Sequence, residues 1–189
     1  MIRGAVRLAL IGAGIGYALD RILAEQSKGA EPDPISSLIV IATQDWHPPS
    51  TPHFAKDGGP WPVHCVAGTW GAELHPALAL PGDAPRVRKG ANGEDGYSGF
   101  TMRDPVSGET IATELEGLLR DAGVEDVVVT GLATDYCVKA TALDAVRLGF
   151  GTAVLTDAVA AVDVEPGDGA RAIEEMQAAG VAIWRTVMR

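Results

Sequence analysis

Three histidines and one aspartate gather in a short stretch of the sequence. Asp45 and His47 are two residues apart, so in an extended segment both side chains point to the same side. His53 and His64 follow in a proline-rich loop, whereas His75 lies apart from this group. A carboxylate with several imidazoles suits a divalent ion such as zinc, iron or manganese. The spacing therefore predicts a metal site formed by Asp45, His47, His53 and His64.

Cys137 is the candidate nucleophile. It follows an apolar run and a tight turn and opens an expected helix, where unpaired N–H groups and the helix dipole stabilise a thiolate. Lys89 ends a short expected strand and precedes a glycine, so we expect its ammonium to reach the same crevice and hold the sulfur charged. Cys65, the other cysteine, is interpreted as an inert core residue.

Short apolar runs rich in β-branched residues predict strands that are buried on both faces of a parallel sheet. Such runs lie at residues 38–42, 127–130, 153–155 and 181–184, with a shorter strand expected at 86–89. Helices are expected over residues 111–122, 137–148 and 168–179. This alternation predicts an open, mainly parallel α/β sheet with helices on both faces and its site beyond the carboxyl ends of the strands.

The N-terminal region allows several interpretations. Apolar side chains recur every three or four positions over residues 5–25, which predicts a helix. A signal peptide is disfavoured because no small-residue cleavage site follows, and a membrane span would need about 20 apolar residues. Gly12 to Tyr17 imitates a dinucleotide fingerprint, but Tyr17 stands where the third glycine belongs. We interpret the region as a buried element of one domain covering residues 1–189.

Composition and charge narrow the class of protein. The chain has 189 residues, 47% of them hydrophobic and 21% charged, which is ordinary for one globular domain. A net charge of -10 argues against nucleic acid or an anionic membrane as a partner and favours a small neutral or cationic ligand. Two widely separated cysteines form no disulfide framework, which fits a cytoplasmic location. A homo-oligomer is left open.

Six motifs together resemble the nicotinamidase/pyrazinamidase family of the isochorismatase-like cysteine hydrolases. The motifs are TQDWHP (residues 43–48), WPVHCVAGT (61–69), GAELHP (71–76), KG (89–90), YSGF (97–100) and GLATDYCV (131–138). The likeness runs from about residue 38 to the C-terminus. It implies an isochorismatase-like fold and hydrolysis of nicotinamide to nicotinate and ammonia in NAD salvage, with pyrazinamide as a further substrate.

The resemblance also implies roles for individual residues. Cys137 would attack the carboxamide carbon, and Lys89 would belong to the catalytic triad. Trp61 and Tyr97 would sandwich the flat ring of the substrate, whose pyridine nitrogen the metal would position. The amides of Ala133 and Cys137 would form the oxyanion hole, next to a cis peptide bond that precedes Ala133. Zinc is the metal expected first, with iron or manganese as alternatives.

The sequence departs from the family at its beginning. The family opens with a strand of the type V-D-x-Q-x-D-F, whose first aspartate is the general base and acid of the triad. Here no acidic residue precedes Asp20, and neither Asp20 nor Glu25 is expected to take that role. Residues 6–25 look more like the family's first helix, so we hypothesise that the opening strand is missing or replaced.

Three functions follow from these observations. The leading hypothesis is a nicotinamidase that works by thiolate attack and an acyl-enzyme. The second is a truncated or impaired homologue that binds metal and ligand without efficient turnover. The third is a hydrolase of another small amide, or an isochorismatase-like hydrolase, which the Asp45–His47 pair argues against. The leading hypothesis requires that the sulfur of Cys137 and the metal ligands meet in one cleft.

Overall fold

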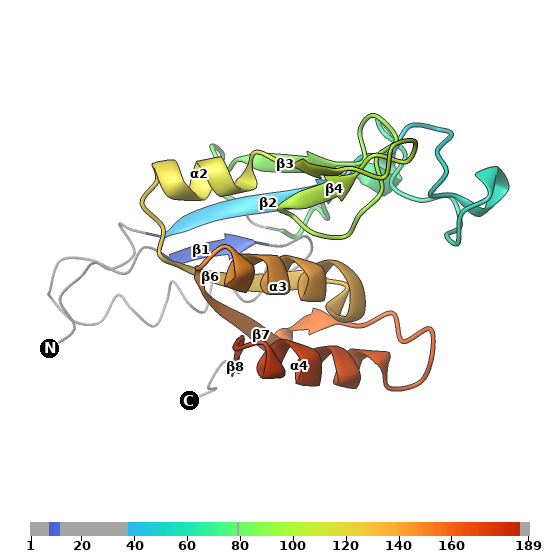
Figure 1. Cartoon of the computed structure of the whole chain (residues 1–189). Helices are drawn as coiled ribbons and strands as arrows, with labels where there is room; N and C mark the ends of the chain where they lie inside the picture. The colour runs from blue at the N-terminus through green and yellow to red at the C-terminus, as the bar shows by residue number, and fades with distance from the viewer. Residues whose placement is uncertain (1–7, 12–37, 79, 186–189) are drawn as a thin grey trace, which may run out of the picture.

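A six-stranded parallel sheet forms the centre of the molecule (Figure 1). The computed structural model describes residues 8–11, 38–78 and 80–185. The strand order is β3-β2-β1-β6-β7-β8. The strands are β1 (Leu8–Ile11), β2 (Ile39–Asp45), β3 (Arg86–Lys89), β6 (Asp126–Leu132), β7 (Gly151–Ala160) and β8 (Ala182–Trp184). The open parallel α/β sheet predicted from the sequence is confirmed.

Strand β1 corrects the prediction for the N-terminal region. Residues Leu8–Ile11 form a strand, not a helical turn, and pair in parallel with β2 on one side and β6 on the other. A short apolar run fits a buried strand and a buried helix equally well by periodicity, which is why the pattern misled. The central strand position is therefore filled by a segment that ends without a carboxylate. The remainder of the expected helix, with Asp20 and Glu25, lies outside the described residues.

The region after β3 also differs from its prediction. The helix expected over residues 111–122 is a short strand followed by a shorter helix, β5 (Thr110–Ala112) and α2 (Leu115–Asp121). Strand β5 pairs antiparallel with β4 (Thr101–Arg103), a hairpin that was not predicted. Thr113 explains the division, because its hydroxyl accepts the N–H of Leu115 and thereby caps the start of the helix.

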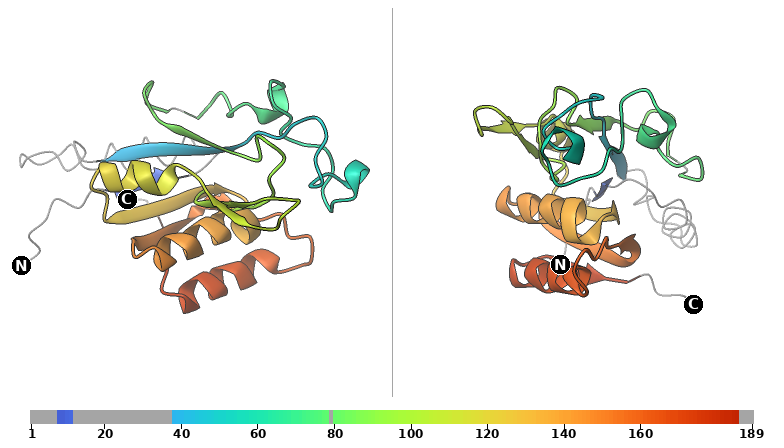
Figure 2. Two further views of the ribbon diagram at one scale, coloured as in Figure 1. Left: turned by 45° about the horizontal axis from the view of Figure 1, so that its top comes forward. Right: turned by 90° about the vertical axis from the view of Figure 1, so that its right-hand side faces the viewer.

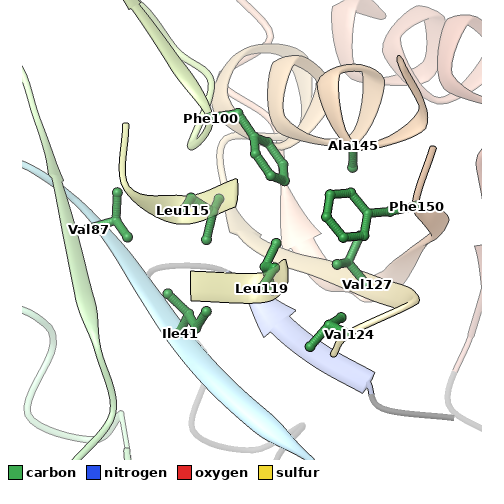
Figure 3. Close-up of a cluster of buried hydrophobic side chains, with 9 residues drawn as sticks. All are labelled: Ile41, Val87, Phe100, Leu115, Leu119, Val124, Val127, Ala145 and Phe150. Carbon is green, nitrogen blue, oxygen red and sulfur yellow. The ribbon is translucent and has the colours of Figure 1, made fainter. Parts of the chain in front are cut away.

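The three described α-helices pack on one face of the sheet (Figures 1 and 2). They are α2, α3 (Lys139–Arg147) and α4 (Asp168–Ala178). Between β6 and α3 lies the π-helical turn η4 (Thr134–Val138). Figure 3 shows the core under α2 and α3, where Leu119 and Val127 meet the stacked rings of Phe100 and Phe150. Burying such side chains stabilises the fold by about 1.5–3 kcal/mol each.

A second cluster of buried residues lies on the opposite face of the sheet. Val40, Val128 and Ala153 come from three neighbouring strands, and Leu38 and Leu80 pack against them. The strands are therefore covered on both faces, as their unbroken apolar runs predict. No helix within the described part of the chain is long and apolar enough to cross a membrane.

The connection from β2 to β3 is long and mostly irregular. Its described residues include two 3-10 turns, η2 (Ala55–Asp57) and η3 (Trp70–Ala72). Within this connection the ring of Phe54 is fully buried, and backbone bridges join His47 to Val66 and Phe54 to Trp61. An irregular segment of this length inside a compact domain is usually functional, and this one leads directly to the site described next.

Candidate active site

One cavity opens at the carboxyl ends of β2 and β6. Its volume is about 300 Å³, within the range of pockets for small molecules. Its lining brings Cys137 and the four predicted ligand residues into one cleft, as the leading hypothesis requires. The lining residues are Asp45, His47, His53, Trp61, Pro62, His64, Gly96, Tyr97, Leu132, Ala133, Tyr136, Cys137 and Val162. Lys89 lies behind this lining, in contact with it.

Lys89 joins the two sides of the cavity. Strands β2 and β3 pair in a register that places Lys89 opposite Asp45. The Lys89 Nζ lies 2.8 Å from Asp45 Oδ1, 3.2 Å from the carbonyl oxygen of Tyr97 and 3.6 Å from Cys137 Sγ. An ammonium group has three protons to donate, and three acceptors surround this one. Lys89 is 3% exposed, so it was correctly expected to face the crevice rather than solvent.

The Lys89–Asp45 pair keeps both of its charges. Burial disfavours the ammonium, but the carboxylate of Asp45 and the sulfur of Cys137 outweigh it and raise the pKa of Lys89. Burial likewise disfavours the carboxylate of Asp45, yet the ammonium of Lys89 lowers its pKa below the ordinary value. The pair is therefore ionised at neutral pH.

The thiol of Cys137 has a raised pKa, contrary to the sequence-based expectation of a stabilised thiolate. Burial is the main cause, and the negative charge of Asp45 adds to it. Lys89 and a backbone hydrogen bond at Ala133 act in the opposite direction without reversing the shift. Cys137 also lies in the π-helical turn ahead of α3 rather than in the first turn of an α-helix. The sulfur is thus protonated at rest and must lose its proton when it reacts.

The turn that carries Cys137 begins at Ala133. The peptide bond between Leu132 and Ala133 is cis, as the resemblance implies. The carbonyl of Ala133 accepts the N–H groups of Tyr136 and Val138, which closes the turn around the cysteine. An oxyanion hole formed by the amides of Ala133 and Cys137 stays a prediction.

The three predicted histidine ligands form one cluster. The ligand atoms of His47, His53 and His64 all lie within 4.8 Å of one another. The Nδ1 of His53 lies 2.8 Å from a carboxylate oxygen of Asp95, and the Nδ1 of His64 lies 2.7 Å from the carbonyl of Pro62. Both partners are hydrogen-bond acceptors, so the Nδ1 of each ring is the donor in this contact, and Nε2 is the atom left to bind a metal. Metal-binding histidines are held by this kind of outer contact.

His47 is suited to a metal for a second reason. Burial, with the nearby His53 and His64, lowers its pKa to about 4, so the ring is neutral at pH 7. Its Nδ1 is buried and has no hydrogen-bond partner among the described residues. Gly90 packs directly against this nitrogen, because a Cβ at that position would stand 2.5 Å from it. A neutral, tightly packed imidazole is the form that binds a divalent ion.

Asp45 stands at the edge of the histidine cluster. Its carboxylate groups with His64 and Cys65 within the same 4.8 Å limit, so His64 is common to both sets. The expected four-residue ligand set is therefore brought together around His64. Carboxylate and imidazole donors fit zinc or a similar divalent ion. Cys65 is half-buried, and burial raises the pKa of its thiol to about 11, which agrees with the expectation of an unreactive residue.

The aromatic residues differ from the predicted sandwich. The ring centroids of Trp61 and Tyr97 are 6.4 Å apart with planes 81° from each other, and Trp61 Nε1 donates to the Tyr97 hydroxyl at 2.9 Å. Hydrogen bonding turns the two rings edge to face, so they form adjoining walls of the cavity instead of parallel plates. Tyr136 contacts both rings, with centroids 4.9 Å and 5.1 Å away.

Some residues of the site were not found from the sequence. Asp95 forms a hydrogen bond with His53. The sequence indicated Asp95 only by its place in the glycine-rich loop, two positions before Tyr97. Tyr136 adjoins Cys137 inside a quoted motif, and Val162 follows β7 with no motif around it. His75 is exposed and lies outside the cavity, as expected.

Comparison with known proteins agrees with this geometry. Residues 23–187 match the isochorismatase domain. The nicotinamidase of Escherichia coli (strain K12) is 42% identical over 161 residues, which cover 77% of this chain and 74% of the relative. The pyrazinamidase of Pyrococcus horikoshii in complex with zinc superposes with a TM-score of 0.74 at 35% identity, covering 95% of this chain and 99% of that one.

A second solved structure adds a ligand to the comparison. PnC1 from L. infantum in complex with nicotinate superposes with a TM-score of 0.77 at 34% identity. The superposition covers 96% of this chain and 94% of that chain. The relatives thus include one structure that holds a metal and one that holds a small pyridine carboxylate.

Proposed function

This chain belongs to the isochorismatase family, and on that premise we propose that it is a nicotinamidase that converts nicotinamide to nicotinate and ammonia. The observation that carries the proposal is a single cavity lined by both Cys137 and the histidine cluster. Relatives that act on nicotinamide or pyrazinamide, or hold nicotinate, support the substrate class. We extend the proposal to pyrazinamide as a second substrate and to a cytoplasmic, single-domain enzyme of NAD salvage.

Asp45, His47, His53 and His64 would hold a divalent metal ion, with zinc proposed first. Such an ion supplies a Lewis acid that can bind the ring nitrogen of the substrate and orient the ring. The chain's own part is to present three imidazoles, two of which have their second nitrogen fixed by Asp95 and Pro62. A zinc-bound relative supports this assignment.

Cys137 would attack the carboxamide carbon and form a thioester as ammonia leaves, and water would then release the acid. Cys137 must lose its thiol proton as it attacks, because burial raises the pKa of Cys137, and that proton would end on the departing nitrogen, which leaves as ammonia. Lys89 lies against the sulfur and would stabilise the thiolate that forms. The amides of Ala133 and Cys137 would receive the negative charge that develops on the carboxamide oxygen. Trp61, Tyr97 and Tyr136 would bound the ring on its flat and edge sides.

An ammonia-release assay with purified, zinc-supplied protein tests the proposal. We expect nicotinamide to be hydrolysed and Cys137→Ala to lower the rate by several powers of ten, since the nucleophile is lost. The metal content of Cys137→Ala should equal that of the unaltered protein, because no ligand is changed. Absence of ammonia above the uncatalysed rate would refute the enzyme activity, and an equal rate in Cys137→Ala would refute the nucleophile.

A second candidate function is a homologue that binds metal and ligand without efficient turnover. The observation that favours it is the double use of Asp45. Among the described residues, Asp45 is the carboxylate that pairs with Lys89, and it also belongs to the proposed ligand set. Calorimetric titration with nicotinate separates the two functions. Binding without any ammonia release from nicotinamide would identify the non-catalytic homologue.

A further inference from the structure

The segment that follows β7 forms one wall of the cavity. Val162 lines the cavity and is 50% exposed, so its side chain reaches the space where a ligand would lie. It belongs to none of the helices and strands, and β7 ends two residues earlier at Ala160. Something other than secondary structure must therefore fix this wall relative to the sulfur of Cys137.

Asp135 provides that connection. It lies in η4, two residues before Cys137, and is 7% exposed. Its Oδ1 accepts the backbone N–H of Val162 at 3.0 Å, and its Oδ2 accepts that of Asp163 at 2.9 Å. Both oxygens of one buried carboxylate thus bind consecutive amides of the wall. Hydrogen bonds to a charged, buried acceptor are the strong kind.

The far side of the wall is fixed as well. Asp163 has a φ of 52°, and its Oδ1 accepts the N–H of Gly169 at 2.8 Å, near the start of α4. Gly169 packs closely on Ala161, because a Cβ on the glycine would stand 2.5 Å from the methyl of Ala161. The wall is held between the nucleophile turn and α4, and the carboxylate of Asp135 ties it to the turn that carries the sulfur.

We propose that Asp135 is a positioning residue that holds the Val162 wall at a set separation from Cys137 and so determines the size of group that reaches the sulfur. The proposal deepens, and rests on, the proposed hydrolysis of a small aromatic amide. Asp135 makes none of the contacts of a nucleophile, a metal ligand or an oxyanion donor. Its effect is on the shape of the binding space, and therefore on substrate affinity more than on the chemical step.

Asp135→Asn tests this assignment. An asparagine side chain has one acceptor oxygen, and its NH2 group would face the second backbone N–H. Two donors cannot bond to each other, and that end of the wall would therefore be released. We measure alkylation of Cys137 by small iodoacetamide and by bulky, flat N-phenylmaleimide, and use peptide mass spectrometry to separate Cys137 from Cys65. We expect the ratio of the bulky to the small reagent's rate to rise about fivefold, the effect of losing one hydrogen bond. The KM for nicotinamide should rise by a similar factor, with kcat changed less than twofold.

Asp168→Asn is the matched control. Asp168 also accepts a backbone N–H in this connection, that of Glu165, but it does not touch the wall. Its variant should keep the reagent ratio of the unaltered protein. The proposal would be overturned if Asp135→Asn and Asp168→Asn had the same bulky-to-small alkylation ratio, whether that ratio is raised or unchanged. The alkylation ratio does not depend on nicotinamide turnover, so failure of the proposed function is recognised separately by the missing ammonia.

Val162→Ala guards against an Asp135 variant that does not fold. Val162 is half-exposed and its backbone bonds to Asp135 are kept, so the fold should be unaffected. Shortening the side chain should raise the bulky-to-small ratio by itself. If Val162→Ala leaves that ratio unchanged, Val162 is no wall for Cys137 and the proposal is refuted.

Discussion

The two sides of the cavity are built in different ways. The sulfur of Cys137 stands on a turn between β6 and α3, both packed into the core, and its position follows from the sheet. His53 and His64 stand on an irregular connection and are held by backbone bridges, the buried Phe54 and contacts to Asp95 and Pro62. The difference teaches that the nucleophile depends on the fold, whereas His53 and His64 depend on local contacts.

Lys89→Met should have the largest effect, because Lys89 serves both sides at once. Removing the ammonium leaves the carboxylate of Asp45 without its partner, and breaking a buried pair costs about 3–5 kcal/mol of unfolding free energy. Lys89 also lowers the pKa of Cys137, so its loss should raise that pKa further and shift alkylation to higher pH. Denaturant unfolding and the pH profile of iodoacetamide reaction measure the two effects.

The stability effect of Lys89→Met has a defined pH dependence. The pKa of Asp45 is lowered in the folded protein, so the pair's contribution is complete above the ordinary aspartate pKa of about 4 and is lost as pH falls through the lowered value. The gap between the two proteins should therefore close in acid. Lys139→Met, which removes an exposed pair with Glu175, is the control and should cost at most about 1 kcal/mol. Equal losses in the two variants would contradict the central place of Lys89.

Removing the metal should affect only the histidine side. Chelation should lower the melting temperature, because the ion stabilises by about 4 kcal/mol when present at a thousand times its dissociation constant. Protease cleavage should become faster within residues 46–85 and stay unchanged in α3. Calorimetry and limited proteolysis with mass spectrometry read the two responses. Faster cleavage in α3 after chelation would show that the two sides are not independent.

Asp95→Asn should weaken metal binding, although it changes none of the proposed ligands. Asp95 fixes the ring of His53, and loss of such an outer partner typically reduces metal affinity about 10- to 100-fold. Competition with a fluorescent chelator measures the change. Asp104→Asn, at an exposed turn in the following hairpin, is the control and should retain full affinity. Unchanged affinity in Asp95→Asn would remove Asp95 from the site.

Trp61→Phe should have the smallest effect. It deletes the hydrogen bond from Trp61 Nε1 to the Tyr97 hydroxyl but keeps an aromatic wall, so we expect about 1 kcal/mol in ligand affinity. Titration with nicotinate measures it. A loss of about 3–5 kcal/mol in ligand affinity, as large as the loss of unfolding free energy expected for Lys89→Met, would mean that the indole itself holds the ligand.

The sequence predicted the parts of this molecule that are coded locally. Apolar runs located β2, β6, β7 and β8, and the motifs around Asp45 and Cys137 predicted that the two would share a cleft. The pattern misled at residues 8–11, where a four-residue strand fits a helical period, and at Ile111, whose strand partner Met102 lies nine residues earlier.

Features set by tertiary packing could not be predicted. Burial decides the pKa of Cys137, and no spacing in the sequence measures how deeply a thiol will lie. The edge-to-face arrangement of Trp61 and Tyr97 depends on a hydrogen bond between residues 36 positions apart. Val162 lines the cavity and its backbone N–H binds Asp135, a contact that the composition of neither segment indicates.

The pairing of β2 with β3 has a consequence for how the protein loses function on heating. Strand β3 is at the edge of the sheet, has four residues, and carries Lys89 at its last position. Edge elements separate at a lower free energy than the central strands. If β3 alone separates from the sheet, the ammonium of Lys89 moves away from Cys137 while the rest of the sheet is still intact. Thermal inactivation of the molecule is thus expected to precede its melting.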